Sequence, residues 1–393
     1  MGEPIGALFE KAVELPPPDA LLDALGLPAG GAVYAFTDEN ENVLQTVGTQ
    51  NLRRSVLFRL APPDDEKRRR RVDLRAVARH VRWTPTYSVF ETYWVYLNLA
   101  RRLRPAEYRK ELAFGPVWFA GVDPAARFPR WQADTVLQAA AVTVGPFADK
   151  ARCTAFIELL EDLFDLCRRY DILVQAPRGR PCVYFEMGKC PAPCDGSMSL
   201  DAYRESTGRS VEFACGNPEP RLGELEEAMR LAAAERAYER AGRFKEVLAR
   251  ARRVLRSDGR LVPTPGEFRF LVVQRAGGTS RVKPFWVDQG AIRVGEPVRL
   301  RQLGEAVPAW IAGLERRGTA DEMDLVHRSE SIWLVSHFLM KGDQAPGLFL
   351  PEWQLADADE AARVITQRFA SSARTSENMR DAGSPSGDVD SGE

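Results

Sequence analysis

The chain has 393 residues, which is enough for two or three domains with separate cores. Hydrophobic residues make up 45% and charged residues 28%, and no apolar run approaches the roughly 18 residues of a membrane helix. The net charge of −1 does not by itself indicate a nucleic-acid partner, and the acidic N-terminus is unlike a signal peptide. We therefore expect a cytoplasmic protein whose six cysteines are reduced and available to metals.

Basic residues are concentrated in one part of the chain. Between residues 51 and 130 there are 18 Lys and Arg against 8 Asp and Glu, and aromatic residues are interleaved with them. A local excess of this kind attracts a phosphate backbone, whereas the simplest alternative for its longest run is a solvated loop. The residues expected to contact DNA are Arg53, Arg54, Lys67, Arg68, Arg69, Arg70 and Arg71.

The N-terminal elements are predicted from turn signals and periodicity. A Pro-rich leader is followed by GAVYAF and NVLQTV, two β-rich runs joined by DENEN, which predict a hairpin. Residues 88–103 have helical apolar spacing and end before Pro105. FGPVWFAGVDP is extended, and DKARCTAFIELLEDLFDLCRRY predicts a second helix. The Cys-rich residues 177–196 have too little apolar periodicity to fold alone, which indicates a metal.

The second half of the chain predicts a mixture of helices and strands. A charged helical stretch covers residues 219–256, with an expected turn at Ala241-Gly242. Residues 266–298 alternate as strands, and amphipathic helices follow around 300–316 and 320–341. The Ser/Gly/Asp-rich C-terminal end is expected to be disordered. We therefore predict an α+β multidomain fold.

Four segments resemble, in the same order, parts of the UvrC excinuclease family. GAVYAFTDENENVLQTVGTQNLRRSV is similar to the opening of the GIY-YIG nuclease domain, and VGPFADKARCTAFIELLEDLFDLC to a Gly-Pro-Phe turn and its following helix. RPCVYFEMGKCPAPCDGSMSLDAYRE resembles the family's Cys-rich signature and is the most specific match. LEEAMRLAAAERAYERAGRFKEVLAR resembles the UVR motif, the helical hairpin through which UvrC and UvrB pair.

The resemblance implies a division of the chain into successive parts. These are a leader (1–28), a small GIY-YIG-like α/β domain (29–112), a helical Cys-cluster region (113–216), a UVR helical hairpin (219–256), a small α+β C-terminal module (262–345), an extended or helical end (346–370) and a disordered tail (371–393). The chain ends before the RNase H-like half of UvrC would begin. We therefore expect the second incision activity to be absent.

The resemblance also implies the residues of a GIY-YIG nuclease site. That site uses two tyrosines, an arginine on the phosphate, a glutamate that holds a divalent metal and an asparagine. Tyr34 stands at the first tyrosine position. The other four positions are occupied by Thr46, Ser55, Tyr96 and Arg109, so Tyr34 is the one family residue that is retained.

The residue at the glutamate position decides what this site can do. A tyrosine, with its pKa near ~10, is neutral at pH 7 and cannot replace a carboxylate on Mg²⁺. Glu91 lies five residues before Tyr96, about 500° around the helix, and so points elsewhere, toward basic residues. We expect an inactive or severely weakened site, which speaks against a divalent metal there, with Tyr34 packed as an ordinary hairpin residue.

Four cysteines form a metal-site pattern. Cys182, Cys190 and Cys194 are separated by 8 and 4 residues, as in the UvrC signature, and Cys167 lies 15 residues before Cys182. The resemblance implies that these thiolates hold a 4Fe–4S cluster. Four cysteines also suit a structural zinc, and spacing does not separate the two metals. Four unrelated buried thiols are the remaining alternative.

The charged helical stretch has two interpretations. Met229, Tyr238 and Phe244 occupy positions at which the UVR motif has apolar contacts, which predicts binding to a UvrB-like hairpin or self-association. The alternative is a solvated charged helix. A single short hairpin buries little surface, which favours a partner.

Three functions compete at this stage. The leading hypothesis is a UvrC-like nucleotide-excision-repair protein that binds DNA and a UvrB-like partner and has lost most nuclease residues. The first rival is an active single-incision GIY-YIG endonuclease in DNA repair that uses shifted residues such as Arg54 and Glu91. The second is a metal-cluster interaction or redox-sensing protein without a DNA role. For residues 262–370 the sequence indicates no function.

Overall fold

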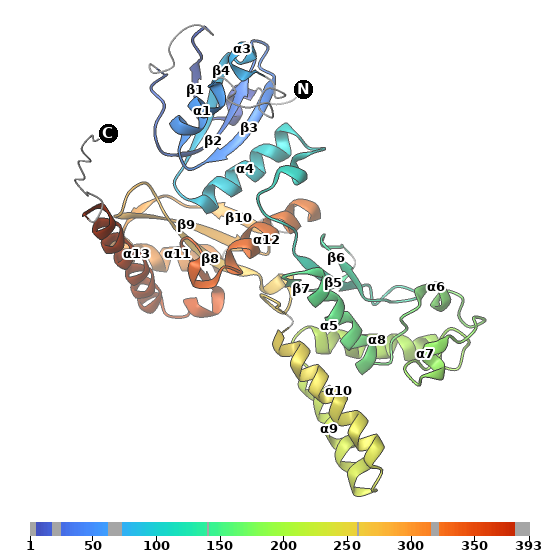
Figure 1. The fold of residues 1–393 in the computed structure, drawn as a ribbon. Coiled ribbons are helices and arrows are strands. Elements are labelled where there is room, and N and C mark those ends of the chain that lie inside the picture. Colours follow the sequence, from blue (N-terminus) through green and yellow to red (C-terminus); the bar gives the residue numbers. More distant parts are fainter. Residues whose placement is uncertain are drawn as a thin grey trace, which may run out of the picture.

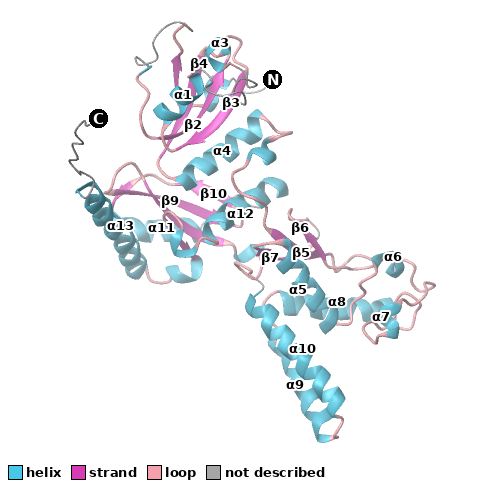
Figure 2. Ribbon diagram, viewed as in Figure 1, coloured by secondary structure: helices cyan, strands magenta, loops and turns pink. Residues whose placement is uncertain are grey.

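The protein is an α+β molecule with several small sheets (Figures 1 and 2). The computed structural model describes residues 5–17, 25–61, 73–139, 141–257, 259–315 and 322–381. In Figure 1 the N-terminal sheet and the C-terminal module lie on either side of helix α4, while α5 to α10 project away from them. Among the described helices, none combines the length and the apolar character that crossing a membrane requires.

The N-terminal sheet has four antiparallel strands in the order β1-β4-β2-β3. They are β1 (Lys11–Glu14), β2 (Gly31–Thr37), β3 (Val43–Thr49) and β4 (His80–Thr86). β2 and β3 form the predicted hairpin. β1 pairs with β4, so the sheet includes residues that were expected to form a separate leader.

A helix covers each face of this sheet. Along the central strand β2, Tyr34 lies in the core formed with α1 (Leu52–Leu60), and its neighbour Val33 packs toward α4 (Val89–Leu103). Successive residues of a strand face opposite sides, so β2 is buried on both. The Ser88 side chain caps α4 by accepting a hydrogen bond from the Glu91 backbone N–H.

The C-terminal module is a second antiparallel sheet with helices on both faces. Its strand order is β10-β9-β8-β12, and β11 pairs with β9. Helices α4 and α12 pack on one face, and α11 and α13 on the other. The elements are β8 (Arg269–Arg275), β9 (Arg281–Asp288), β10 (Ala291–Val294), β11 (Val298–Arg299), β12 (Leu348–Pro351), α11 (Leu303–Glu315), α12 (Leu325–Leu339) and α13 (Ala358–Asp381). The strands and the two amphipathic helices agree with the prediction.

Helix α4 joins the two sheets into one unit. Its Phe90 is fully buried and packs edge-on against Phe285 of β9 and Phe338 of α12. At the other end of α4, the carboxylate of Glu330 is completely buried. It accepts hydrogen bonds from Arg101, Arg109 and Tyr108. The module therefore covers the α4 face that points away from the N-terminal sheet.

The middle region contains a sheet that the sequence analysis missed. Strands β5 (Trp118–Val122), β6 (Gln132–Asp134) and β7 (Val142–Phe147) pair in the order β6-β5-β7. β6 has three residues, too few to show an alternating pattern. Helix α5 (Lys150–Leu163) packs on this sheet and ends earlier than predicted. Asp165, just beyond it, adopts a positive φ of 54°, which a continuing helix does not allow.

An arm with little regular structure follows α5. It contains two single helical turns, α6 (Tyr170–Leu173) and α7 (Val183–Glu186), and leads into α8 (Leu200–Ala214). The rest of the Cys-rich segment is turns and loops. This agrees with the expectation that it has too few apolar residues for a core of its own.

Helices α9 (Glu219–Ala234) and α10 (Tyr238–Ser257) form a long hairpin, but the predicted turn is wrong. The chain reverses around Arg236, which has a φ of 60°, and the Ala237 N–H closes the end of α9 by donating to the Ala232 carbonyl. Gly242 lies inside α10, where an added Cβ would meet no other atom within 4 Å. A glycine inside a solvated helix turn costs too little to break it.

The C-terminal helix is longer than predicted. α13 continues to Asp381, past residue 371, where the disordered tail was expected to begin. Alanine, arginine, glutamate and methionine in this stretch are good helix formers, which the Ser-rich composition concealed. Residues 382–393 lie outside the described part of the chain.

Candidate functional site

A pocket of about 240 Å³ lies at the edge strand β3, beside α4. Two of the predicted nuclease positions, Thr46 and Tyr96, line it. The other lining residues come from β3, α1, α4 and the segment after α4: Gln45, Val47, Gly48, Arg59, Thr92, Tyr93, Glu111, Ala113 and Phe114. The fold therefore brings a part of the predicted site together.

Tyr34 and Ser55 are connected to this pocket through Arg59. The Tyr34 hydroxyl and Ser55 Oγ are 2.9 Å apart, and Arg59 Nη1 donates to Ser55 Oγ at 2.9 Å. Burial raises the pKa of Tyr34, so its hydroxyl stays protonated. No carboxylate of the described residues forms an ion pair with Arg59, which leaves a cation at the pocket wall.

Tyr96 does not offer an anionic oxygen to the pocket. Its hydroxyl donates to Glu111 Oε2 at 3.1 Å, and Arg104 Nη1 holds Glu111 Oε1 at 2.7 Å. Burial, helped by the neighbouring Glu111 charge, raises the pKa of Tyr96 to about 12. Among the described lining residues Glu111 is the one carboxylate, and both of its oxygens are already engaged.

Thr46 is an unsatisfied polar group in the pocket lining. Its side chain is buried, and Oγ1 has no hydrogen-bond partner among the described residues. The neighbouring Gly48 lets β3 approach α4 closely, because a Cβ there would lie 3.0 Å from Thr92 Cγ2. An unpaired buried hydroxyl is costly unless a ligand or a water completes it.

Two other residues from the sequence analysis are held elsewhere. Arg109 donates from Nε to Glu330 Oε1 at 2.5 Å and does not line the pocket. Glu91 is buried and accepts from Lys283 Nζ at 2.7 Å and from the Tyr87 N–H at 2.8 Å. As the helical spacing indicated, Glu91 pairs with a basic residue.

Sequence reasoning missed Arg59 and Glu111. Arg59 lies one helical turn after Ser55, the position at which the resemblance places an arginine, so an i to i+4 relation could have indicated it. Glu111 comes from the short helical turn Tyr108–Glu111, and no periodicity links it to Tyr96. Only the folded chain reveals this contact.

In the described ranges no group of three or more His, Cys, Asp or Glu side chains is arranged to hold a metal ion. The pocket offers a cation, a buried hydroxyl and aromatic rings, but it lacks the free acidic ligand that metal-assisted phosphodiester hydrolysis requires.

The predicted DNA-contacting arginines are accessible where the structure describes them. Arg53 and Arg54 are exposed in the first turn of α1. The run from Lys67 to Arg71 lies outside the described residues.

The four predicted metal-binding cysteines lie on the segment between α5 and α8, where the described residues form no group of three or more side chains arranged to hold a metal. Cys167, Cys190 and Cys194 are buried, and Cys182 is half-buried just before α7. A hydrogen bond between the Cys167 and Cys190 sulfurs raises the pKa of Cys167 and lowers that of Cys190 to about 7. Burial raises the pKa of Cys194, and the nearby Cys190 and Cys182 charges add to this effect. The four thiols are therefore electrostatic neighbours.

The two remaining cysteines are separate from this group. Cys153 is fully buried in α5, within the core of the middle region. Cys215 is half-buried at the C-terminal end of α8. Burial raises the pKa of each thiol, which keeps both protonated and unreactive.

The hairpin residues divide into two groups. Met229 and Phe244 pack against the core of the middle region, so they hold the hairpin in place. Tyr238 is 70% exposed and Leu231, which the sequence analysis did not select, is 54% exposed. The accessible apolar surface of the hairpin is thus near its tip.

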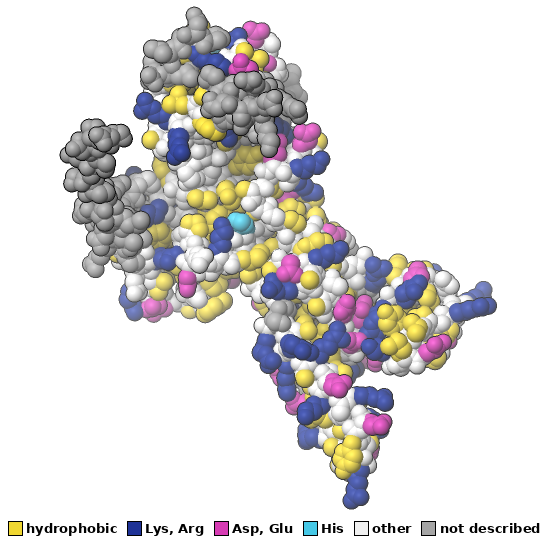
Figure 3. All heavy atoms as spheres, in the orientation of Figure 1, with side chains coloured by type: hydrophobic (Ala, Val, Ile, Leu, Met, Phe, Trp, Pro, Cys, Tyr) yellow, Lys and Arg dark blue, Asp and Glu magenta, His cyan; other side chains and the backbone are white. Residues whose placement is uncertain are grey.

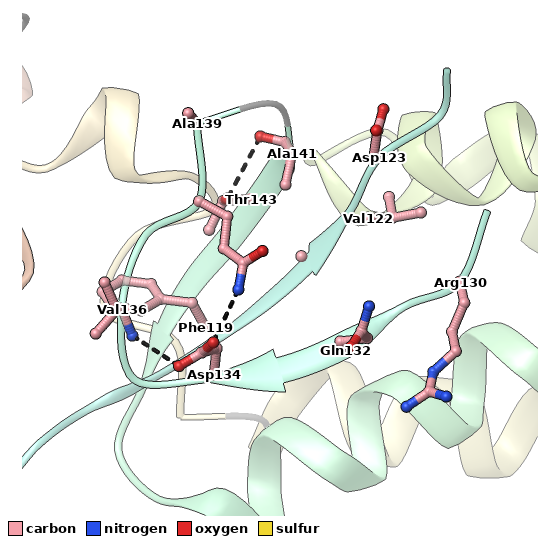
Figure 4. A pocket seen from close by; sticks show the side chains of 12 residues that line it. Phe119, Val122, Asp123, Arg130, Gln132, Asp134, Val136, Ala139, Ala141 and Thr143 are labelled. Carbon is pink, nitrogen blue, oxygen red and sulfur yellow. Dashed lines mark hydrogen bonds between the residues drawn. The ribbon is translucent and has the colours of Figure 1, made fainter. Parts of the chain in front are cut away.

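A second pocket, of about 180 Å³, lies on the β6-β5-β7 sheet (Figure 4). Asp134 accepts hydrogen bonds from the Val136 N–H and from Gln138 Nε2, and Figure 4 shows both bonds. Arg130 stacks its guanidinium over the Tyr170 ring at 4.9 Å. The Asp134 bonds tie the loop after β6 to the end of that strand, and the Arg130 contact connects the start of β6 to α6.

The comparisons with known proteins first identify one domain within the chain. Residues 118–213, which contain the β6-β5-β7 sheet, α5, the arm and α8, match the UvrC/Cho excinuclease middle domain. The comparison with solved structures yields no match.

The whole-chain comparisons extend this similarity. UvrABC system protein C of Natronomonas pharaonis is 31% identical over 225 residues, which are 57% of this chain and 38% of that protein. The proteins of the same name from Geotalea daltonii and Syntrophotalea carbinolica are 27% and 24% identical, over 58% and 69% of this chain and 36% and 44% of theirs. The chain is therefore similar to UvrC proteins, with a match to their middle domain, and it spans less than half the length of these curated relatives.

Proposed function

We propose that this protein acts in nucleotide excision repair as a UvrC-family protein that binds DNA and a UvrB-like partner without cutting DNA through its N-terminal site. The relatives whose name is UvrABC system protein C support the repair role. In this proposal the β1-β4-β2-β3 sheet with α1 and α4 is a GIY-YIG-like domain, and α9 with α10 is the UVR hairpin.

The pocket at β3 is the observation that carries the proposal. Arg59 provides a positive charge that no described carboxylate pairs with, whereas Glu111 is neutralised by Arg104 and accepts a further hydrogen bond from Tyr96. A phosphate is attracted to such a site. A divalent cation is not, because it needs free anionic oxygens.

Incubating the purified chain with DNA tests both parts of the proposal. We expect duplex binding that weakens with salt, with a log–log slope of about −0.9 for each phosphate neutralised. Nicked, damaged and branched DNA should stay intact with Mg²⁺ or Mn²⁺. Binding and lack of incision should be the same for Tyr34→Phe, whose hydroxyl performs no chemistry in this proposal.

Two results would contradict it. Metal-dependent incision that Tyr34→Phe abolishes would establish an active endonuclease. Absent or salt-independent DNA binding would favour the interaction or redox-sensing protein. The Arg59→Gln variant measures how much the pocket contributes to DNA binding. It removes the pocket cation and keeps the exposed Arg53 and Arg54.

The tip of the hairpin is the proposed partner surface. We expect Tyr238→Ala to weaken capture of a UvrB-like protein by about fivefold or more, as for an exposed aromatic interface residue. Phe244→Ala should act differently, by loosening the hairpin from its own core. Trp353→Ala is the matched control, because this side chain is 76% exposed but lies in the C-terminal module. Equal capture by Tyr238→Ala and the unaltered chain would remove the tip from the interface.

Cys167, Cys182, Cys190 and Cys194 are proposed to hold a 4Fe–4S cluster or a structural zinc. Their chemistry suits either metal and Cys167, Cys190 and Cys194 are buried, but the described residues do not bring three of these side chains into a metal-holding group, so the proposal requires the arm to close around the metal. When bound, such a group would link the segment that follows α5 to the rest of the arm through metal–sulfur bonds. This link replaces the apolar core that the arm lacks.

A further inference from the structure

The pocket at β3 contains hydrogen-bonding groups that the fold does not use. Thr46 is only 8% exposed, and its Oγ1 has no partner among the described residues. The half-buried Gln45 carboxamide also forms no hydrogen bond with them. Arg59 donates to Ser55 from Nη1 and interacts with the Tyr34 hydroxyl, which engages only part of the guanidinium fork. Unused polar groups that line one pocket indicate a bound ligand.

The charges at this pocket favour an anion with more than one negative charge. Arg59 and Arg104 stand against a single carboxylate, Glu111, which Arg104 already binds at 2.7 Å. A phosphate at the end of a strand or on a free nucleotide carries about −1.5 to −2 charges at pH 7, more than the single charge of a backbone phosphate. A guanidinium can also bind two of its oxygens at once. A terminal phosphate is therefore the better complement to Arg59.

Aromatic rings form another part of the pocket wall. Tyr93, Tyr96 and Phe114 all line it, and the rings of Tyr93 and Phe114 are 26° from parallel with centroids 6.1 Å apart. Nucleobases pack against aromatic side chains whatever their sequence, and a Gln carboxamide such as that of Gln45 can bond a base edge. The volume of about 240 Å³ is below the ~300–1,000 Å³ of sites for drug-sized ligands, so the pocket suits one nucleotide and not a longer segment.

We propose that this pocket holds a single nucleotide with a terminal phosphate, whose phosphate binds Arg59 and Thr46 while its base packs against Tyr93 and Phe114. The nucleotide is the phosphorylated end of a DNA strand or a free nucleotide, since the two share this chemistry. For the strand end, the proposal rests on the proposed DNA binding and deepens it, because the protein then recognises DNA that has already been cut.

The surroundings of the pocket agree with a strand end. Arg53 and Arg54 are exposed in the first turn of α1, the helix that carries Arg59 in its last turn. Arg54 precedes Arg59 by five residues, about 7.5 Å along the helix axis. Figure 3 shows further Lys and Arg side chains scattered over the N-terminal part of the molecule. These cations can hold the phosphates that follow the terminal one.

Fluorescence anisotropy with the full chain, in the presence of EDTA, tests the proposal. The probes are duplexes of one sequence with a single-stranded overhang that ends in a 5′-phosphate, a 3′-phosphate or a hydroxyl. We expect one phosphorylated end to bind about tenfold more tightly than the hydroxyl end, as for one additional charge-assisted hydrogen bond. Titration with dAMP and with inorganic phosphate then shows whether a free nucleotide also binds and whether its base contributes.

Three substitutions identify the pocket as the site of this preference. Thr46→Val removes the unpaired hydroxyl and keeps the side-chain shape, so the variant should fold at least as stably and still lose most of the preference. Arg59→Gln should abolish the preference. Tyr93→Leu should weaken binding of the phosphorylated nucleotide but not of inorganic phosphate. Arg363→Gln is the matched control, because this arginine lies on α13, away from the pocket, and is 70% exposed.

The outcomes separate this inference from the proposed function. Salt-dependent binding that is equal for phosphorylated and hydroxyl ends, without binding of dAMP, would overturn the inference and leave the DNA-binding function standing. Binding of dAMP without binding of any duplex would do the reverse. A preference that persists in both Thr46→Val and Arg59→Gln would place the terminal phosphate elsewhere, and inorganic phosphate that binds as tightly as dAMP would exclude the base contact. Either of these results contradicts the inference.

Discussion

Replacing Glu330 with alanine is expected to lower the free energy of unfolding by about 3–5 kcal/mol, the range for removing one partner of a buried ion pair. Glu330 is fully buried between α12 and α4, and it accepts hydrogen bonds from Arg101, Arg109 and Tyr108. Arg101 is only 9% exposed, so the substitution leaves a buried cation without its carboxylate. For a unit of this size the thermal midpoint should fall by roughly 6–20 °C, measured by circular dichroism.

Glu360→Ala provides the matched control for this prediction. Glu360 pairs with Arg363 on the surface of α13, and their side chains are 46% and 70% exposed. Such a pair contributes only ~0–1 kcal/mol, so the control should unfold almost like the unaltered chain. If Glu330→Ala also lost less than about 1 kcal/mol, the buried network would not hold the two sheets together.

Replacing Cys190 with serine is expected to remove the bound metal and destabilise the arm. The unaltered protein, purified without oxygen, should be brown and contain iron and sulfide. Cys190 is buried, and a serine hydroxyl is a much weaker ligand than a thiolate for either proposed metal. The measurements are iron, sulfide and zinc content, together with protease sensitivity between α5 and α8.

Cys215→Ser is the matched control for the metal prediction. Cys215 is half-buried at the end of α8 and lies outside the group of four. Its replacement should therefore preserve both colour and metal content. A colourless protein with stoichiometric zinc would exclude iron, and a metal-free protein with a protease-resistant arm would exclude both metals.

Local sequence signals predicted most of the elements and part of the site. The β2–β3 hairpin, helix α4 and the strands β8 to β10 follow from turn residues and apolar spacing. Short strands were not predicted, and examples are the three-residue β6 and the edge strand β1. The hairpin turn was predicted at Gly242 because glycine favours turns. The chain instead reverses at Arg236, where an arginine adopts a positive φ that its residue type does not indicate.

The candidate site shows the same division. Thr46 and Tyr96 could be selected because motif spacing places them on β3 and α4. Arg59 lines the pocket one helical turn after Ser55, where an arginine was expected, and Glu111 contacts Tyr96 from a segment that no motif covers. Arg109 was assigned to the site, but the buried Glu330, more than 200 residues away, holds it elsewhere.

The sequence alone determined the family resemblance, the cysteine pattern and the prediction that Tyr96 stands at the glutamate position, because each depends on residue identity at short spacing. Tertiary structure decided which charges remain available. Lys283 neutralises Glu91, Arg104 and Tyr96 both bind Glu111, and Glu330 binds Arg101 of α4. Each of these ion pairs and hydrogen bonds joins residues that are far apart in the sequence or on opposite sides of a turn. Coulomb energy depends on distance in space, which residue order does not reveal.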